Sequence, residues 1–121
     1  MSSTTSFKPH HVYALRKPLS PNSPFKFVLV VTNEEFAYRH RQQTVTVLLL
    51  SPTPRETDSE IRVQIQSKSN GGTATLPGDH WVAVDSLTFM PKANMFVTSG
   101  TEISELEKGM VRKKLANWLA L

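Results

Sequence analysis

Short apolar runs, typical of β-strands, alternate along this chain with loops rich in proline and glycine. The runs at residues 25–32 and 44–50 are almost continuously apolar, as expected of strands that are buried on both faces. Residues 61–66 alternate strictly between apolar and polar side chains, which predicts a strand with one face in water. A further run at 11–15 is also β-prone. Because each run is short and bounded by turn residues, the chain is restricted to a small β-rich fold.

Another strand-like segment, residues 78–89, contains an acid between two apolar parts. The segment follows a turn signal, Pro77-Gly78-Asp79, and its apolar pattern is interrupted at Asp85 and Ser86. An acid in this position is costly unless its side chain has a partner or reaches solvent. Asp85 is therefore expected either to form a corner with a hydrogen-bonded side chain or to lie in a cleft and have a function there.

The C-terminal segment has the pattern of an amphipathic α-helix. Ser104 followed by Glu107 is a capping-box pattern at its start. Apolar side chains then recur at spacings of three and four and predict one stripe that packs on the sheet. The members of this stripe are Ile103, Leu106, Met110, Val111, Leu115, Trp118 and Leu119. The expected fold class is mostly β with a C-terminal α-helix, arranged as a small, partly open β-barrel that the helix closes.

The length and composition indicate a soluble protein with one folded domain. A chain of 121 residues suits a single core, and we expect a flexible N-terminal arm at residues 1–9 and one domain at residues 10–121. The lack of cysteine excludes disulfides, thiol catalysis and thiolate metal sites. The first residues lack the apolar part of a secretory signal, and the run at 45–50 is too short to span a bilayer. We therefore expect a cytoplasmic protein without membrane contact.

The positive charge is concentrated in the first half of the chain. The formal net charge is +4, and residues 1–50 contain six Lys and Arg against two Glu. This excess predicts a basic face, which either serves solubility alone or binds an anionic partner such as nucleic acid. The proline-rich segment 18–24 follows Arg16 and Lys17 and is followed by Lys26. Long loops without regular structure are uncommon in small domains and are often functional.

Four segments of the chain, in order, match segments of a known protein family. Residues 11–15 stand at its opening strand, and residues 28–36 are similar to its valine-rich strand and the Ser-Asn-Asp-Glu-Phe-like cap that follows. Residues 48–53 fall where the family has a strand ending in Pro-x-Thr-Ser, and residues 82–87 look like its Ala-Asp-Gln-Ile segment. On these segments the chain resembles the MazF/PemK (Kid) family of toxins from toxin–antitoxin systems.

The resemblance implies an SH3-like barrel, a homodimer and binding of a cognate antitoxin. It also implies an endoribonuclease that cleaves single-stranded RNA, including mRNA, without a metal or other cofactor. In that chemistry the 2′-hydroxyl of the substrate attacks the phosphorus. The protein then supplies a proton acceptor, a proton donor for the leaving 5′-oxygen, and groups that stabilise the phosphorane.

The positions that match the family's motifs supply the candidate site residues. Lys26 stands near the family's arginine, although lysine cannot bind a phosphate bidentately as arginine does. Two other positions depart from the pattern, because Thr88 replaces a basic residue and Pro54 replaces a serine. The expected catalytic residues are Lys26, Thr53 and Asp85. The expected RNA-binding residues are Arg16, Lys17, Ser51 and Arg55.

Two other functions remain open. One is a non-enzymatic poison of the related CcdB type, which binds DNA gyrase through its C-terminal helix. Trp118, close to the C-terminal end, is the residue that resembles this branch. The other is a catalytically inactive SH3-like binding module that descends from either type.

Overall fold

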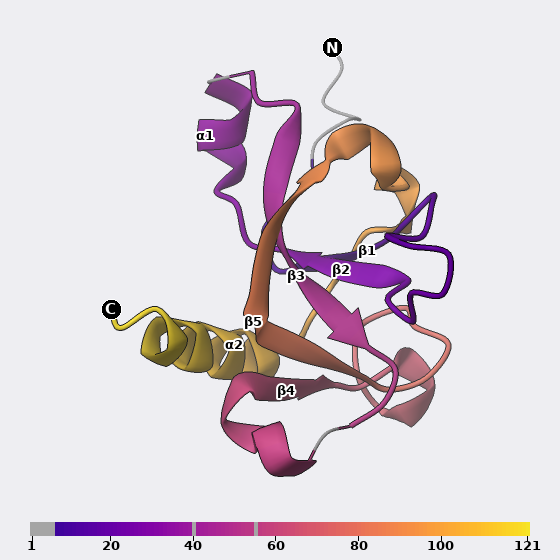
Figure 1. The fold of residues 1–121 in the computed structure, drawn as a ribbon, viewed down its shortest axis with the longest axis vertical. Helices are drawn as coiled ribbons and strands as arrows, with labels where there is room; N and C mark the ends of the chain where they lie inside the picture. The colour runs from indigo at the N-terminus through magenta and orange to yellow at the C-terminus, as the bar shows by residue number, and fades with distance from the viewer. Residues whose placement is uncertain (1–6, 40, 55) are drawn as a thin grey trace.

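Six strands form one bent sheet with a C-terminal helix packed against it in the computed structural model (Figure 1). The structure describes residues 7–39, 41–54 and 56–121, except for the side chains of residues 37 and 56–58. The order across the sheet is β4-β5-β3-β2-β1-β6, with antiparallel pairing between neighbours. The strands are β1 (His11–Ala14), β2 (Phe27–Val30), β3 (Thr44–Ser51), β4 (Arg62–Ile65), β5 (His80–Pro91) and β6 (Thr101–Glu102), and the helices are α1 (Glu34–Arg39) and α2 (Glu105–Trp118). This confirms the predicted fold class, a mostly β, partly open barrel with a C-terminal helix.

The core lies on both faces of β2 and β3. Leu29, Leu48 and Leu50 belong to a buried cluster that also contains residues of β4, β5 and α2. Val28 and Val47 belong to a second cluster on the other face, with residues of β1 and of the segment after β5. The two nearly continuous apolar runs are therefore buried on both faces, as their composition predicts.

Strand β5 contains a wide bulge at its middle. Val47 of β3 pairs with Thr88, but Leu49 pairs with Ala83, so residues 84–87 of β5 lie against Leu48 alone. The Ser86 hydroxyl fills the gap in the ladder, because its Oγ accepts from Leu49 N at 2.9 Å and donates to Ala83 O at 2.6 Å. The polar interruption seen in the sequence is thus a bulge within one strand, and β5 changes direction along its length (Figure 1).

Helix α2 does not bury the predicted apolar stripe. Val111 is buried and Leu115 is partly buried, but Leu106 is 76% exposed and Trp118 is 52% exposed. The helix lies beside β4 at the edge of the sheet, where Lys114 Nζ donates to the carbonyl oxygens of Ser59 and Arg62. The expectation that the whole stripe packs on the sheet was therefore wrong, because only Ile103, Val111 and Leu115 of the stripe reach the core cluster. No helix in the described ranges is long and apolar enough to cross a membrane.

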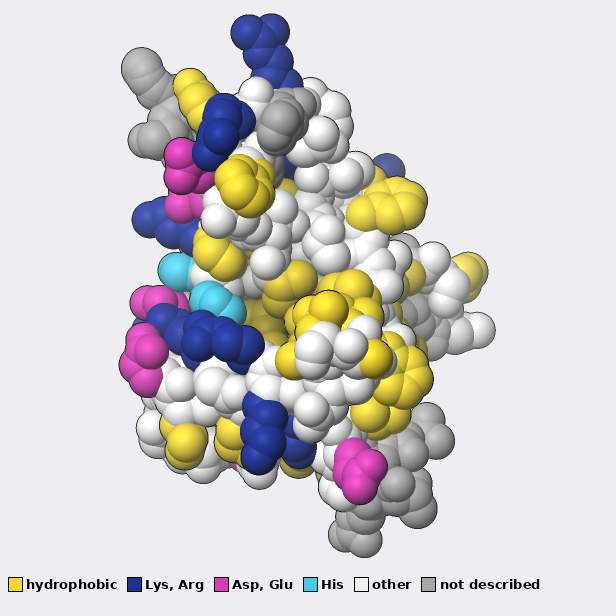
Figure 2. All heavy atoms as spheres, turned by 90° about the vertical axis from the view of Figure 1, so that its left-hand side faces the viewer, with side chains coloured by type: hydrophobic (Ala, Val, Ile, Leu, Met, Phe, Trp, Pro, Cys, Tyr) yellow, Lys and Arg dark blue, Asp and Glu magenta, His cyan; other side chains and the backbone are white. Residues whose placement is uncertain are grey.

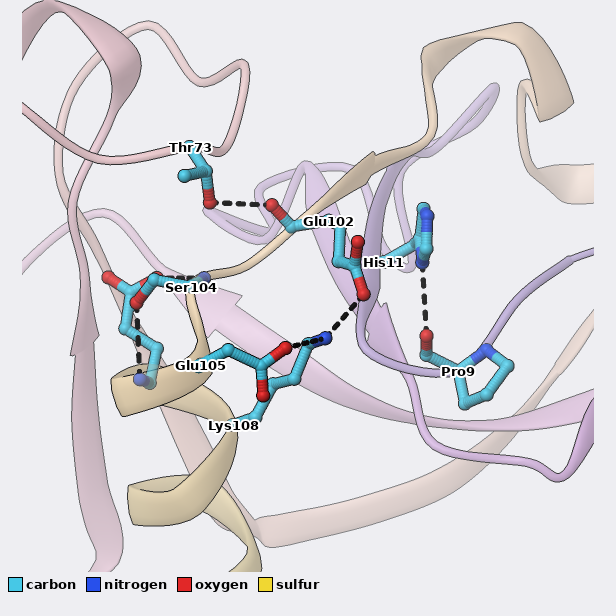
Figure 3. A network of polar contacts seen from close by, with 8 residues as sticks. Pro9, His11, Thr73, Glu102, Ser104, Glu105 and Lys108 are labelled. Carbon is cyan, nitrogen blue, oxygen red and sulfur yellow. Dashed lines mark hydrogen bonds and ion pairs between the residues drawn. The ribbon is translucent and has the colours of Figure 1, made fainter.

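The first turn of α2 is fixed by polar contacts (Figure 3). Ser104 and Glu107 form the predicted capping box, in which each side chain accepts from the backbone N–H of the other. Glu107 is buried, and its second oxygen accepts from Gln66 N at 2.9 Å. Lys108 binds the carboxylates of Glu102 and Glu105. The hydrogen bond and charge of Lys108 lower the pKa of the Glu102 carboxyl, and the same contact raises the pKa of Lys108.

Three segments between the strands contain short turns or isolated bridges. The segment after β5 forms two 3-10 turns, η4 (Lys92–Asn94) and η5 (Val97–Ser99), with a single bridge between Leu15 and Met95. Residues 73–76 contribute the bridge from Ala74 to Ser67. The acidic segment before β4 is a 3-10 helix, η2 (Glu56–Ile61).

The described part of the N-terminal segment packs on the domain. The predicted arm covers residues 1–9, of which 1–6 lie outside the described residues. Phe7 is buried and meets the Tyr13 ring edge-to-face at 4.9 Å between centroids. His10 follows in the left-handed backbone region, with a φ of 64°. His10 N donates to Val30 O, and His10 O accepts from Ile103 N. These two hydrogen bonds join the segment to β2 and to the chain before α2.

Lowering the pH is expected to destabilise the fold through His10. Burial, followed by the positive charges of Lys108 and Arg112, lowers the pKa of His10 from its ordinary value of 6.5. As the pH falls below about 6.5, the unfolded chain binds a proton on His10 before the folded protein does, which favours unfolding. The stability contribution of neutral His10 is therefore full above about pH 6.5 and is lost as the pH falls through the folded-state pKa. The melting temperature should therefore fall between about pH 7.5 and about pH 5.5.

The variant His10→Asn tests this assignment, because asparagine tolerates the left-handed backbone but does not titrate. The drop in melting temperature between the two pH values should be smaller in this variant than in the wild type. An equal drop in both proteins would contradict the role of His10.

Candidate functional site

A groove of about 820 Å³ lies between the loop that follows β1 and the outer half of β5. Residues 16–19 of the loop form one side, and residues 85–91 of β5 form the other. Leu49 of β3 and residues 93–94 of η4 complete the lining. The groove thus begins at the β5 bulge and ends at the 3-10 turn that follows the strand.

The cationic side of the groove is held in place by η4. Arg16 N donates to Asn94 O at 2.8 Å, and Lys17 N donates to the Asn94 side-chain oxygen at 3.0 Å. The Arg16 guanidinium lies 4.3 Å from the centroid of the Phe96 ring, a cation–π contact. Two positive side chains therefore stand at a defined place on the rim. Asn94, which organises both of them, has no local sequence signal that would have identified it.

Asp85 stands at the bulge and has a charged partner. Its Oδ1 accepts from Arg62 Nη1 at 2.7 Å, and the two side chains are 31% and 12% exposed respectively. The ion pair satisfies the requirement that an acid between apolar strand segments be partnered. Asp85 also lines the groove. Asp85 is therefore a bonded residue at the bulge that also lines the groove, and its function there stays a prediction.

Exposed apolar side chains share the groove with these charges. Phe89 is 70% exposed, Leu19 is 44% exposed and Leu87 is 38% exposed. Leu87 and Phe89 flank Thr88 where β5 leaves the bulge. No sequence signal identifies these apolar residues as part of a groove, because the bulge breaks the regular alternation of the strand.

Ser51 and Thr53 form a second polar group at the end of β3. The Ser51 hydroxyl donates to Thr53 O at 3.0 Å and accepts from Thr53 N at 3.2 Å. The two hydroxyl oxygens are 3.3 Å apart. Lys26 is exposed and lies one residue before Phe27, which pairs with Leu50 of β3. Lys26 and the hydroxyls of Ser51 and Thr53 therefore lie at neighbouring ends of β2 and β3.

The predicted site residues fall into two groups. Arg16, Lys17 and Asp85 line the groove together. Lys26, Ser51 and Thr53, which the structure describes, lie at the ends of β2 and β3 and not in the lining of the groove. Arg55 lies outside the described residues. Leu49 connects the two groups, because it lines the groove and stands two residues before Ser51 on β3.

Within the described residues, no three His, Cys, Asp or Glu side chains are grouped so that they could hold a metal ion. The chemistry that these residues offer comes from cations, hydroxyls and one ion-paired carboxylate.

Two solved structures share the architecture of this chain. One is an endoribonuclease in complex with its cognate antitoxin from Mycobacterial species, with a TM-score of 0.70 and 19% identity over 96% of this chain and 97% of that chain. The other is an endoribonuclease from Mycobacterial species, with a TM-score of 0.68 and 22% identity over 96% and 93% of the two chains. This chain has the fold of these endoribonucleases. No protein-family model and no curated protein matches the sequence.

Proposed function

We propose that this protein is an endoribonuclease toxin of a toxin–antitoxin module and that it cleaves single-stranded RNA. The observation that carries this proposal is the correspondence of nearly the whole chain with nearly the whole of two endoribonucleases, one of them bound to its antitoxin. A shared fold does not by itself imply a shared activity. The groove supports the proposal independently, because it combines two cations with exposed apolar side chains.

RNA binding is assigned to the groove and the adjoining turn. Arg16 and Lys17 contact phosphates, and their fixed backbone positions reduce the entropy lost on binding. The exposed ring of Phe89 offers a surface on which a base stacks, as aromatic residues do in proteins that bind single strands. Ser51, and Arg55 next to the turn, add hydrogen-bonding and charged contacts to the backbone of the same strand.

Cleavage is assigned to Lys26, Thr53 and Asp85. The 2′-oxygen of the substrate attacks the phosphorus, the bond to the 5′-oxygen breaks, and the products carry a 2′,3′-cyclic phosphate and a 5′-hydroxyl. Lys26 stabilises the phosphorane and gives a proton to the leaving oxygen. Asp85 is assigned as the acceptor of the 2′-hydroxyl proton, which requires the groove that Asp85 lines and the strand ends that carry Lys26 and Thr53 to meet at one phosphate when RNA is bound. The Thr53 hydroxyl donates a hydrogen bond to a phosphate oxygen. No step requires a metal ion.

The test is incubation of the purified protein with single-stranded RNA of mixed sequence in the presence of EDTA. Fragments that end in a 2′,3′-cyclic phosphate are expected, and an all-2′-deoxy strand of the same sequence should remain intact. If RNA of many sequences stays uncut while circular dichroism shows a folded protein, the proposal is wrong. If cleavage occurs only after a divalent cation is added, the protein is an endoribonuclease but the metal-independent mechanism is wrong.

We assign two protein partners to this toxin. It forms a homodimer, so its mass in solution should be twice that of one 13.6 kDa chain. A cognate antitoxin binds it and blocks RNA cleavage in the cytoplasm, where the mRNA substrate is found. Co-expression of the antitoxin should restore growth and transcript integrity in cells that produce the toxin.

One observation favours the gyrase-binding alternative. Trp118 is 52% exposed on α2, where Met110 is 40% exposed, so an apolar surface is available near the C-terminus. A poison of this kind would arrest growth while the transcripts stay intact, and Trp118→Ala would remove the arrest without unfolding the protein. Transcript decay that persists in Trp118→Ala would exclude it.

A further inference from the structure

A second groove, of about 780 Å³, adjoins the first at Arg16 and Ala93, which line both. Its lining comes from the N-terminal segment, the loop after β1, the end of α1 and the chain that follows it, and the turns η4 and η5. The residues that the structure describes in this lining include three cations, Arg16, Arg41 and Lys92, and no acid. The same basic surface therefore continues past Arg16, beyond the groove assigned to RNA.

Backbone hydrogen bonds fix the chain at each of the two new cations, Arg41 and Lys92. Lys92 N donates to Gln43 O at 2.9 Å, directly next to the pair formed by Thr44 and Pro91 at the end of the β3–β5 ladder. Arg41 N donates to Tyr38 O at 3.1 Å and closes the turn after α1. The turn after α1 and the start of η4 thus form one fixed edge, at the upper end of the molecule in Figure 1.

Aromatic and amide side chains accompany the charges. Tyr38 is 83% exposed in this groove, although burial of its ring would be favourable. Phe89 lines the first groove, and Arg16, which lines both grooves, places its guanidinium over the Phe96 ring. Cations interleaved with exposed aromatic rings along a continuous groove are the arrangement by which proteins bind single-stranded nucleic acid without strict sequence preference. By contrast, the face seen in Figure 2 mixes Lys and Arg with Asp and Glu side chains.

We infer that the second groove binds the same RNA strand beyond the cleavage site, with Arg41 and Lys92 on phosphates and Tyr38 stacked on a base. This inference rests on the proposed function. It assigns an RNA-binding role to residues at the end of α1 and the start of η4, which are not among the site residues expected from the sequence. It also predicts that affinity rises with RNA length until the strand reaches the turn after α1.

The test measures strand binding by the Thr53→Val protein, in which cleavage is slowed, with labelled 2′-O-methyl strands of about four and about twelve nucleotides, which lack the attacking hydroxyl. In this background the additional pair of changes Tyr38→Ala and Lys92→Ala should weaken binding of the longer strand about tenfold or more, because base stacking and a phosphate contact are lost. The advantage of the longer strand over the shorter should largely disappear. The slope of log affinity against log salt should fall by about 0.7 for the lost lysine.

Arg39→Gln is the matched control. Arg39 lies in the same turn of α1, but it is paired with Glu35 at 3.0 Å and does not line the groove. This variant should bind both strands as the Thr53→Val protein does. Unchanged melting temperatures confirm that each variant is folded.

The outcomes separate the two proposals. If the wild type cleaves RNA but Tyr38→Ala with Lys92→Ala leaves the length dependence intact, the second groove is not an RNA path and the inference is wrong. If the two changes convert a dimer into a monomer, the groove is a contact between copies of the chain, and the inference is again wrong. If the wild type neither binds nor cleaves RNA, the proposed function itself fails.

Discussion

Replacing Lys26 by alanine is expected to lower the rate of RNA cleavage by about 10²- to 10³-fold, the usual effect of removing one group that stabilises charge in a transition state. Lys26 is exposed at the start of β2, beside the turn that contains Ser51 and Thr53, so its loss should leave the fold intact. Single-turnover cleavage of a labelled RNA by the purified variant measures the effect. Lys113→Ala, a change of an exposed lysine on α2, is the matched control and should cleave at the wild-type rate.

Conservative changes at Lys26 and at Thr53 test the two catalytic assignments separately. Lys26→Arg restores the residue type of the MazF-like pattern and should cleave at least as fast as the wild type, because a guanidinium binds phosphate through two parallel hydrogen bonds. Thr53→Val keeps the shape of the side chain but removes the hydroxyl, and it should slow cleavage while Thr53→Ser retains it. If Lys26→Ala and Thr53→Val both cleave at the wild-type rate, the catalytic site lies elsewhere.

Replacing Glu107 by alanine should lower the free energy of unfolding by about 2–4 kcal/mol, because two backbone N–H groups lose their acceptor in a buried place. These are Ser104 N, 3.0 Å from one carboxylate oxygen, and Gln66 N, 2.9 Å from the other. The side chain therefore joins the start of α2 to the end of β4. Equilibrium unfolding in urea, followed by circular dichroism, gives the urea midpoint and the m-value of each protein, and from these the change in the free energy of unfolding.

Glu105→Ala is the control for this stability prediction. Glu105 is in the same helical turn and binds Lys108 at 2.8 Å, but its side chain is 90% exposed. An exposed ion pair contributes little, so the change should cost less than about 1 kcal/mol. Equal effects of Glu105→Ala and Glu107→Ala would show that the loss comes from charge at the helix start and not from the buried hydrogen bonds.

Local patterns predict much of this fold. Ser104 and Glu107 identify the start of α2 because a capping box involves residues only three apart. The runs that become β2 and β3 are recognisable because both of their faces are apolar. The face of α2 that meets the sheet is not predictable in this way. Helical periodicity produces a stripe that includes Leu106 and Trp118, whereas only Ile103, Val111 and Leu115 of that stripe join the core, beside the buried Glu107.

The candidate site is less predictable than the fold, because its geometry depends on contacts between distant segments. The sequence identifies Arg16, Lys17 and Asp85 as candidates. Their meeting in one groove depends on the β5 bulge and on Asn94, which holds the loop to η4. Arg62, the partner of Asp85, stands on a strand that the sequence analysis treated as structural only. The catalytic roles of Lys26, Thr53 and Asp85 remain predictions that the variants above address.

The bulge in β5 also affects how such a chain can change in length. The pairs on either side of it, Val47 with Thr88 and Leu49 with Ala83, keep separate registers. Residues inserted next to Ser86 would reshape the floor of the groove, while the pairs on either side of the bulge keep their own backbone hydrogen bonds. Related chains can therefore differ in length inside a central strand, so that the groove can diverge between relatives while the barrel core stays the same.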